Sequence, residues 1–408
     1  MNCRHCQRPL QHTFLDLGFA PPSNRYLGPA DLNRAETYLP LRLFVCDACW
    51  LVQTEDFASE TELFVEDYAY FSSVSRSWLE HARHYAHAIT KRLGLTRDSL
   101  VIEVASNDGY LLKNFVAAGV PCLGIEPTAS TAAAAEQLGI PVLREFFGEA
   151  LARRLADEGR QADLIAGNNV YAHVPDINDF TAGLCAALKP EGVVTLEFPH
   201  LLQLIEGMQF DTVYHEHFSY LSLTAVTSIF KQAGLLVFDV EELATHGGSL
   251  RVYGCRIASA RTELPSVAAM IAKEASRGLT RLDTYAAFQQ SIYRIRDDLL
   301  LFLIEQRRAG RTVVAYGAAA KGNTLLNYAG IKPDLLPYVC DAAPSKQGKF
   351  MPGSHVPIVS PDRLKETRPD VVLVLPWNIR EEVERQLDYI AEWGGKLATA
   401  VPEMKLLG

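Results

Sequence analysis

The sequence predicts an α/β protein with three parts. Two C-x2-C pairs near the start predict a small N-terminal zinc domain with four cysteine ligands at residues 1–60. Buried strands alternate with helices from residue 99 and again from residue 311, and each alternation predicts a doubly wound, Rossmann-like sheet. We therefore divide the rest of the chain into a central domain at 61–262, with a helical lead-in at 61–97, and a C-terminal part at 263–408.

Composition narrows the class of protein. Of the 408 residues, 48% are hydrophobic and 21% are charged, which is typical of a soluble globular protein and excludes disorder of the whole chain. The net charge of −9 is unlike the basic face of a nucleic-acid binder. The first residues form no apolar signal segment, and the apolar runs are too short to span a bilayer. We expect a cytoplasmic protein that binds neither nucleic acid nor membrane.

Four of the eight cysteines predict the metal site. Cys3 and Cys6 form one pair and Cys46 and Cys49 the other, and two such turns complete a tetrahedral set of thiolates. Four thiolates leave no open position for water, so we expect structural zinc. A pair of redox-active C-x-x-C motifs is the alternative. The other cysteines lie in apolar or strand-like stretches and are expected to be inert thiols: Cys122, Cys185, Cys255 and Cys340.

The central domain should contain a parallel sheet. Residues 99–106, 122–126, 163–169 and 192–198 read as buried strands separated by helices. Residues 235–240 and 250–255 form a late strand pair joined through the sequence HGGS. Parallel strands bind ligands at their carboxyl ends.

The loop after the first strand, EVASNDG, is the predicted cofactor loop. It lacks the G-x-G-x-x-G pattern of dinucleotide-binding proteins. It is closer to the E-x-G-x-G-x-G loop of S-adenosylmethionine methyltransferases, although Ala105 and Asn107 stand where that loop has glycines. Glu126 ends the next strand and can accept hydrogen bonds from ribose hydroxyls. An ordinary strand-to-helix turn is the alternative.

The densest polar cluster is the segment DTVYHEHFSY at residues 211–220. Burying four titratable side chains in a row costs free energy, so such a segment indicates a functional site. A histidine of this segment can remove a proton from a carbon beside a carbonyl, with neighbouring Tyr and Glu side chains assisting. A zinc-chelating His-x-His pair and a solvated loop are the alternatives. His173 and Tyr68 are further candidates, although such a residue taken alone is more often structural than catalytic.

The C-terminal part begins with a helical stretch at 263–309. Strands follow at 312–316, 338–340, 370–375 and 396–401. The first strand leads into YGAAAKGNT, whose small residues let backbone amides approach an anion such as a pyrophosphate. A packed turn with a surface lysine is the alternative. Lys321 adds a positive charge to this turn, and Lys346, Lys349 and His355 follow the next strand. Together they form a basic cluster at the mouth of the predicted site on an acidic protein.

These motifs, in this order, resemble the S-adenosylmethionine-dependent C-methyltransferases that act on nucleotide-linked keto-deoxysugars. The resemblance covers nearly the whole chain and rests on LDLGFAPPSNRYL, CDACWLVQ, IEVASNDGYLL, NNVYAHV, TVYHEHFSYLS, HGGSLRVY and YGAAAKGNTLLNYAG. It implies a class I methyltransferase fold for the central domain. It also implies methylation of a sugar carbon adjacent to a 4-keto group.

The resemblance implies roles for particular residues. His217 would be the base, with Tyr214, Glu216, His173 and Tyr68 completing the catalytic pocket. S-adenosylmethionine would be held by Glu103, Ala105, Asn107, Gly109, Glu126, Asn168 and Asn169. The C-terminal domain would bind the nucleoside diphosphate of the sugar through Tyr316, Lys321, Thr324, Lys346 and Lys349.

Three other functions stay open at this point. An RNA or tRNA methyltransferase combines zinc knuckles with this sheet, although the acidic charge argues against it. A non-catalytic sugar-nucleotide or interaction module would not need the Tyr/His/Glu cluster. A sugar O-methyltransferase would share the fold but transfer the methyl group to oxygen. We expect a monomer or a weak oligomer.

Overall fold

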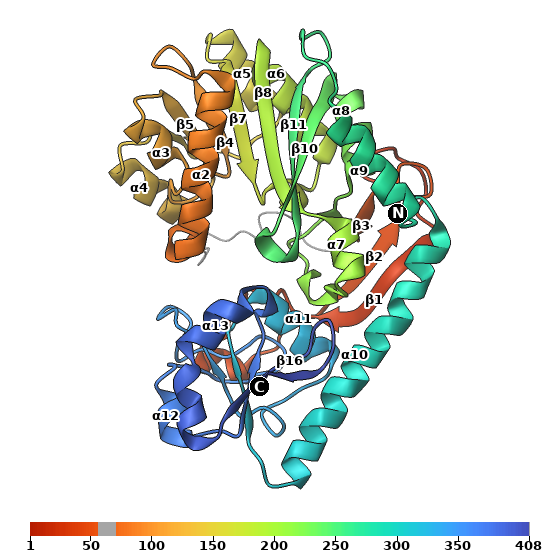
Figure 1. Cartoon of the computed structure of the whole chain (residues 1–408), viewed down its shortest axis with the longest axis vertical. Coiled ribbons are helices and arrows are strands. Elements are labelled where there is room, and N and C mark those ends of the chain that lie inside the picture. The colour runs from red at the N-terminus through yellow and green to blue at the C-terminus, as the bar shows by residue number, and fades with distance from the viewer. Residues whose placement is uncertain (56–70, 408) are drawn as a thin grey trace.

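The computed structural model describes residues 1–55 and 71–407, which contain three β-sheets (Figure 1). The N-terminal sheet has the order β1-β2-β3-β9 and is antiparallel. Its strands are β1 (His12–Ala20), β2 (Leu39–Val45), β3 (Val52–Thr54) and β9 (Ser219–Tyr220). The first three belong to the zinc domain, whereas β9 comes from the predicted catalytic segment. The two parts of the chain are therefore joined by backbone hydrogen bonds.

The central sheet has seven strands in the order β10-β11-β8-β7-β4-β5-β6. They are β4 (Val101–Val104), β5 (Cys122–Ile125), β6 (Val142–Leu143), β7 (Ala162–Asn168), β8 (Leu188–Pro199), β10 (Leu235–Leu243) and β11 (Ser249–Arg256). The predicted parallel arrangement is confirmed for β4 to β8, and the predicted late strand pair is antiparallel, with β11 antiparallel to both of its neighbours. Only residues 244–248 separate β10 from β11, and a parallel connection needs a longer crossover.

Helices cover both faces of this sheet (Figure 1). They are α2 (Arg76–Leu93), α3 (Leu112–Ala117), α4 (Ala129–Gln137), α5 (Glu149–Asp157), α6 (Ile177–Ala187) and α8 (Leu223–Gln232). Helix α7 (Leu201–Glu206) lies below the sheet and packs its leucines with the N-terminal strands. Helix α2 begins where the Ser75 hydroxyl accepts the amide of Trp78 and ends at Gly94, whose φ is 65°. The lead-in predicted as helical over 61–97 is thus an α-helix only at α2 within its described part.

The connector predicted as continuous helix over 263–309 consists of two helices, α9 (Pro265–Ser276) and α10 (Leu282–Arg308). The break contains Gly278, whose φ of 85° ends α9. The long helix α10 then runs beside β1 and reaches the C-terminal domain (Figure 1). No helix in the part of the chain described is both long and apolar enough to cross a bilayer.

The C-terminal sheet has the order β14-β13-β12-β15-β16-β17 and is parallel except at β17. Its strands are β12 (Val313–Tyr316), β13 (Val339–Cys340), β14 (Ile358–Val359), β15 (Val371–Val374), β16 (Lys396–Thr399) and β17 (Lys405–Leu407). Its helices are α11 (Ala320–Tyr328), α12 (Arg363–Thr367) and α13 (Arg380–Gln386). Strands β6, β14 and β17, of two or three residues, are too short to give a periodic signal in the sequence.

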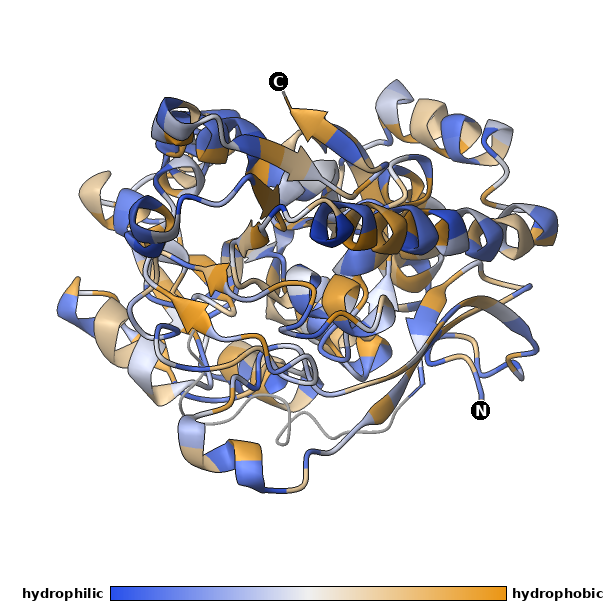
Figure 2. Cartoon of the chain, turned by 90° about the horizontal axis from the view of Figure 1, so that it is seen from below, coloured by the Kyte–Doolittle hydropathy of each residue, from blue (hydrophilic) through white to orange (hydrophobic). Residues whose placement is uncertain are grey.

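One hydrophobic core joins the N-terminal sheet to the C-terminal domain. Phe14 of β1, Leu202 of α7, Leu299 of α10 and Leu326 of α11 all belong to this cluster and are almost fully buried. In Figure 2 the strands are mostly hydrophobic, whereas the helices alternate hydrophobic and hydrophilic residues. Because the parts share a core, residues from all of them are held in fixed positions around the site between them.

Candidate active site

The four predicted cysteines form one cluster. Their sulfur atoms lie within 4.8 Å of one another, with 3.5 Å from Cys3 to Cys49 and 3.4 Å from Cys6 to Cys46. Zinc–sulfur bonds of about 2.3 Å in a tetrahedron place sulfurs roughly 3.8 Å apart, so the cluster fits a zinc ion. It is the only group that could hold a metal among the described residues. Its four thiolates leave no place for a substrate, which is the arrangement of a structural site.

The first cysteine turn is attached to the central domain through Arg4 and His5. The Arg4 guanidinium donates to the carbonyl oxygens of Thr54 (3.1 Å) and Pro175 (2.7 Å) and lies over the ring of Phe218. The Nδ1 atom of His5 lies 2.9 Å from the side-chain oxygen of Asn178. The zinc cluster thereby supports the two segments that carry His173 and His217.

One ring nitrogen of His217 is fixed by the backbone. Its Nδ1–H donates to the carbonyl of Thr212 at 3.0 Å, which leaves the lone pair on Nε2. No residue among those described bonds that Nε2 atom. The ring centroid of His217 lies 4.0 Å from that of Tyr214, 4.5 Å from that of His173 and 5.9 Å from that of Tyr220.

Burial controls the charge of these histidines. It lowers the pKa of His217 well below its ordinary value, and the nearby His173 lowers it further. Burial also lowers the pKa of His173 to about 4, although the bond from its Nδ1–H to the Glu216 carbonyl (2.8 Å) opposes this effect. Both rings are therefore neutral near pH 7, and His217 can accept a proton.

His215 faces away from His217. Its Nε2 lies 3.2 Å from the Pro40 carbonyl and 3.4 Å from that of Leu39, on β2. The rings of His215 and His217 are thus committed to different carbonyls, which argues against the chelating alternative. Tyr68, the remaining catalytic candidate, lies outside the described residues.

Glu216 receives a hydrogen bond from the zinc domain. The side-chain amide of Asn24 donates to the Glu216 carboxylate at 2.6 Å. Burial raises the pKa of Glu216 to about 7, and the Asn24 bond opposes this rise. Asn24 belongs to the segment between β1 and β2, so the zinc domain contributes directly to the site. The sequence motif contains Asn24, but nothing local to it indicates this partner.

Replacing Glu216 with glutamine is expected to change how stability depends on pH. Folded Glu216 keeps its proton up to about pH 7, whereas an ordinary glutamate loses it near 4.5, so this group's contribution to folding stability falls as pH rises between those values. Glutamine removes that cost. We expect Glu216→Gln to be more stable than wild type at pH 8, by at most about 3 kcal/mol, and equal near pH 4. Urea unfolding at both pH values measures the difference. The exposed Glu263→Gln is the control, and a pH-independent difference would contradict the assignment.

The cofactor loop is held from the adjacent strand. The two carboxylate oxygens of Glu126 accept the backbone amides of Asn107 (3.0 Å) and Thr128 (2.9 Å). Ala105 and Asn107 adopt positive φ angles of 56° and 48°, so they occupy the conformation for which glycine is usual. Gly109 cannot be replaced in this way, because a Cβ there would lie 2.5 Å from the Ile140 side chain.

The ends of β4 and β7 present buried polar groups that suit a polar cofactor. Among the described residues, none forms a hydrogen bond with the buried side-chain oxygen and nitrogen of Asn168, one buried oxygen of Asp108 or the buried side-chain oxygen of Asn169. Such groups are costly unless a ligand or water bonds them. Glu103 lies beneath the loop with no exposed surface, and burial raises its pKa well above the ordinary value. The residues predicted for S-adenosylmethionine therefore gather at one end of the sheet.

Lys321 is half-buried in the first turn of α11. Its ammonium donates to the side-chain oxygen of Asn378 at 2.6 Å and lies 4.6 Å from the centre of the Trp377 ring. The indole N–H of Trp377 donates to Asp211 at 2.7 Å. Burial lowers the pKa of Lys321, and its charge contributes to the low pKa of His217. The alternative of a surface lysine is therefore wrong.

The other predicted nucleotide-binding residues are bonded to different parts of the chain. Lys346 donates to the Ala318 carbonyl at 2.8 Å, and the Ala318 amide donates to Asp341 at 2.7 Å. The Thr324 hydroxyl donates to the Val213 carbonyl, and the Tyr316 hydroxyl donates to Gln386 from the opposite face of the sheet. Lys349 is half-buried in the loop before β14.

Comparisons with known proteins agree with this architecture. Three family models match, described as "Putative zinc binding domain" (residues 3–64), "Methyltransferase domain" (78–240) and "C-methyltransferase C-terminal domain" (244–402). The chain is 33% identical over 405 residues to C-methyltransferase NovU of Streptomyces niveus, covering 99% of this chain and 96% of that protein.

Two solved structures resemble part of the chain at TM-scores too low to carry an argument. The PH0226 protein of Pyrococcus horikoshii matches 49% of this chain and 100% of its own, with 14% identity and a TM-score of 0.38. The glycopeptide N-methyltransferase MtfA matches 43% of this chain and 94% of its own, with 14% identity and a TM-score of 0.34.

The fold, the zinc cluster and these matches define an S-adenosylmethionine-dependent C-methyltransferase with an N-terminal zinc-binding domain. The resemblance deduced from the sequence motifs is confirmed at that level. The chain belongs to the family of C-methyltransferases that includes NovU.

Proposed function

We propose that this enzyme methylates the carbon next to the 4-keto group of a nucleoside-diphosphate-linked deoxyhexose, through an enolate. The observation that carries the proposal is the geometry of His217, whose Nδ1–H donates to the Thr212 carbonyl while no described residue forms a hydrogen bond with Nε2. Because burial keeps this imidazole neutral near pH 7, its lone pair is available to accept a C–H proton. NovU, a C-methyltransferase, extends over nearly the same length.

Each residue of the site would have its own role in catalysis or binding. His217 Nε2 takes the proton from the sugar carbon, and Tyr214 packs against the imidazole. His173 and Glu216 shape the pocket, because the His173 ring is fixed to the Glu216 backbone. The cofactor loop, Glu126 and Asn168 would hold S-adenosylmethionine, whose sulfonium supplies the methyl group. Lys346 and Lys349 of the C-terminal domain would bind the diphosphate, together with Lys321.

A deuterium-exchange experiment tests the enolate and the site of transfer together. With dTDP-4-keto-6-deoxyglucose and S-adenosylhomocysteine in D2O, the enzyme should replace a proton beside the keto group. With S-adenosylmethionine, NMR should show a new carbon-bound methyl group. An oxygen-bound methyl group would instead support the O-methyltransferase. Transfer of labelled methyl to RNA, with no transfer to any keto-sugar nucleotide, would overturn the proposal.

A further inference from the structure

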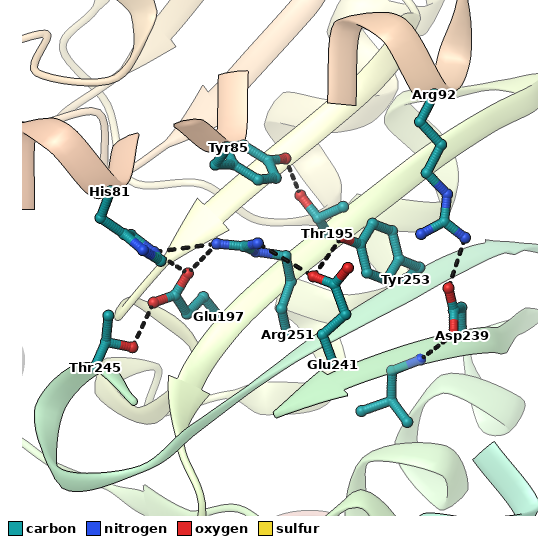
Figure 3. Close-up of polar contacts among 11 residues, drawn as sticks. His81, Tyr85, Arg92, Thr195, Glu197, Asp239, Glu241, Thr245, Arg251 and Tyr253 are labelled. Carbon is teal, nitrogen blue, oxygen red and sulfur yellow. Dashed lines mark hydrogen bonds and ion pairs between the residues drawn. The ribbon is translucent and has the colours of Figure 1, made fainter. Parts of the chain in front are cut away.

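His246 is an imidazole that none of the roles above uses. It lies in the turn between β10 and β11 with φ 55° and ψ 23°, a left-handed conformation that costs a residue with a side chain about 1 kcal/mol. Its neighbour Thr245 donates to Glu197 at 2.9 Å, and Glu197 is in turn bonded to His81 and Arg251 (Figure 3). The turn is therefore anchored, and the strained residue is held in place.

One side of the His246 ring contacts residues at the end of the sheet where the cofactor is predicted to bind. Its Nε2 atom lies 3.1 Å from the side-chain nitrogen of Asn169, and its ring meets the Trp78 ring edge-on at 5.1 Å. An amide N–H only donates, so Nε2 is the acceptor and the ring proton is on Nδ1. No residue among those described accepts a hydrogen bond from this Nδ1–H.

The same ring shares the electrostatic environment of the base. Burial lowers the pKa of His246 to about 4, and the charge of Lys321 lowers it further. The turn that carries His246 is bonded to the segment that precedes the base, because the side-chain amide of Gln209 donates to the Gly247 carbonyl at 2.7 Å. Trp377 donates to Asp211 in the same segment, and its ring lies 4.6 Å from the Lys321 ammonium. Both imidazoles are neutral at pH 7. They present opposite atoms, however: His217 offers a lone pair at Nε2, whereas His246 offers an N–H at Nδ1.

We propose that His246 is a catalytic residue whose Nδ1–H donates a hydrogen bond to the carbonyl oxygen of the keto substrate as that oxygen becomes an enolate. The inference rests on the function proposed above and adds the group that stabilises the enolate. The proton of the sugar C–H passes to His217 Nε2, and the C–H electron pair forms the enolate C=C bond while the carbonyl π pair moves to oxygen. His246 keeps its proton, as a neutral imidazole acting as an electrophile does.

Two substitutions at position 246 distinguish the Nδ1–H donor from the contact of Nε2 with Asn169. In His246→Gln the amide reaches the place of Nε2 and keeps the contact with Asn169, but no donor remains at Nδ1. In His246→Asn the amide nitrogen takes the place of Nδ1, and the contact with Asn169 is lost. Loss of one oxyanion donor lowers a rate by about 10²–10³-fold. We expect that loss of C–H exchange in His246→Gln and a loss below about 10-fold in His246→Asn.

The readout is deuterium exchange of dTDP-4-keto-6-deoxyglucose with S-adenosylhomocysteine bound, together with S-adenosylhomocysteine affinity, which should change only a few-fold. The exposed His84→Gln is the control. Exchange by His246→Gln at the wild-type rate would overturn the assignment of His246 alone, whereas absence of both exchange and methylation in the wild type would overturn the proposed function.

The tautomer can be measured without any substrate. Two-bond ¹H–¹⁵N correlation spectra of histidine-labelled enzyme should show His246 protonated at Nδ1. Asn169→Asp, which presents only acceptors, should move the proton to Nε2 and slow exchange. A wild-type ring protonated at Nε2 would contradict the proposal, even if the substituted proteins failed to fold.

Discussion

Replacement of His217 with asparagine is expected to lower kcat by about 10³–10⁴-fold, in the upper range for loss of a general base. The asparagine side chain can still donate to the Thr212 carbonyl, as Nδ1 does now, so the loop should keep its conformation. No atom then takes the place of the Nε2 lone pair. S-adenosylhomocysteine should bind within a few-fold of its wild-type affinity, because Glu126 and the cofactor loop are unaffected.

The neighbouring histidine provides the matched control for that experiment. His215→Gln removes a ring held by the Leu39 and Pro40 carbonyls, so it should cost stability, about 1–3 kcal/mol, and leave kcat of the folded protein near wild type. Isothermal titration, thermal unfolding and initial rates separate these effects. A His217→Asn enzyme that retains more than a tenth of wild-type kcat would refute the assignment of the base.

Removal of the zinc ligand Cys46 is expected to affect both folding and turnover. Structural zinc contributes on the order of 10 kcal/mol to small domains. Cys46 and Cys49 lie in the turn between β2 and β3, and β3 pairs with β9, two residues beyond His217. Cys46→Ala should therefore lower the Tm by more than about 10 °C and also displace the base. Prolonged chelation should do the same to the wild type.

Elemental analysis and calorimetry check this expectation. Wild-type enzyme should hold one zinc per chain and Cys46→Ala should hold none. Cys185→Ala, which alters a half-buried cysteine outside the cluster, should retain both zinc and activity. A metal-free wild-type protein with an unchanged Tm would show that the four thiols need no ion.

The site was only partly predictable from the sequence. The segment at 211–220 was recognisable because titratable residues follow one another there, but His215 and His217 could not be distinguished by spacing. Asn24 and Trp377 carry no local signal, since their partners Glu216 and Asp211 are 192 and 166 residues away in the chain. Of the catalytic candidates, Tyr68 lies outside the described residues, and the roles of the others stay predictions.

The sequence by itself determined the four-cysteine cluster, the two alternations of strand and helix, the cofactor loop and the family. These features depend on residue types at fixed spacings along the chain, and such spacings can be read from the sequence alone. The tertiary structure decided that β11 is antiparallel to β8, that Lys321 is half-buried and bonded to Asn378, and that β9 joins the predicted catalytic segment to the zinc domain. It also decided which nitrogen of His217 is open, because the Thr212 carbonyl occupies the other one. Tautomer, burial and charge depend on which groups meet in space, and those groups come from all three parts of the chain.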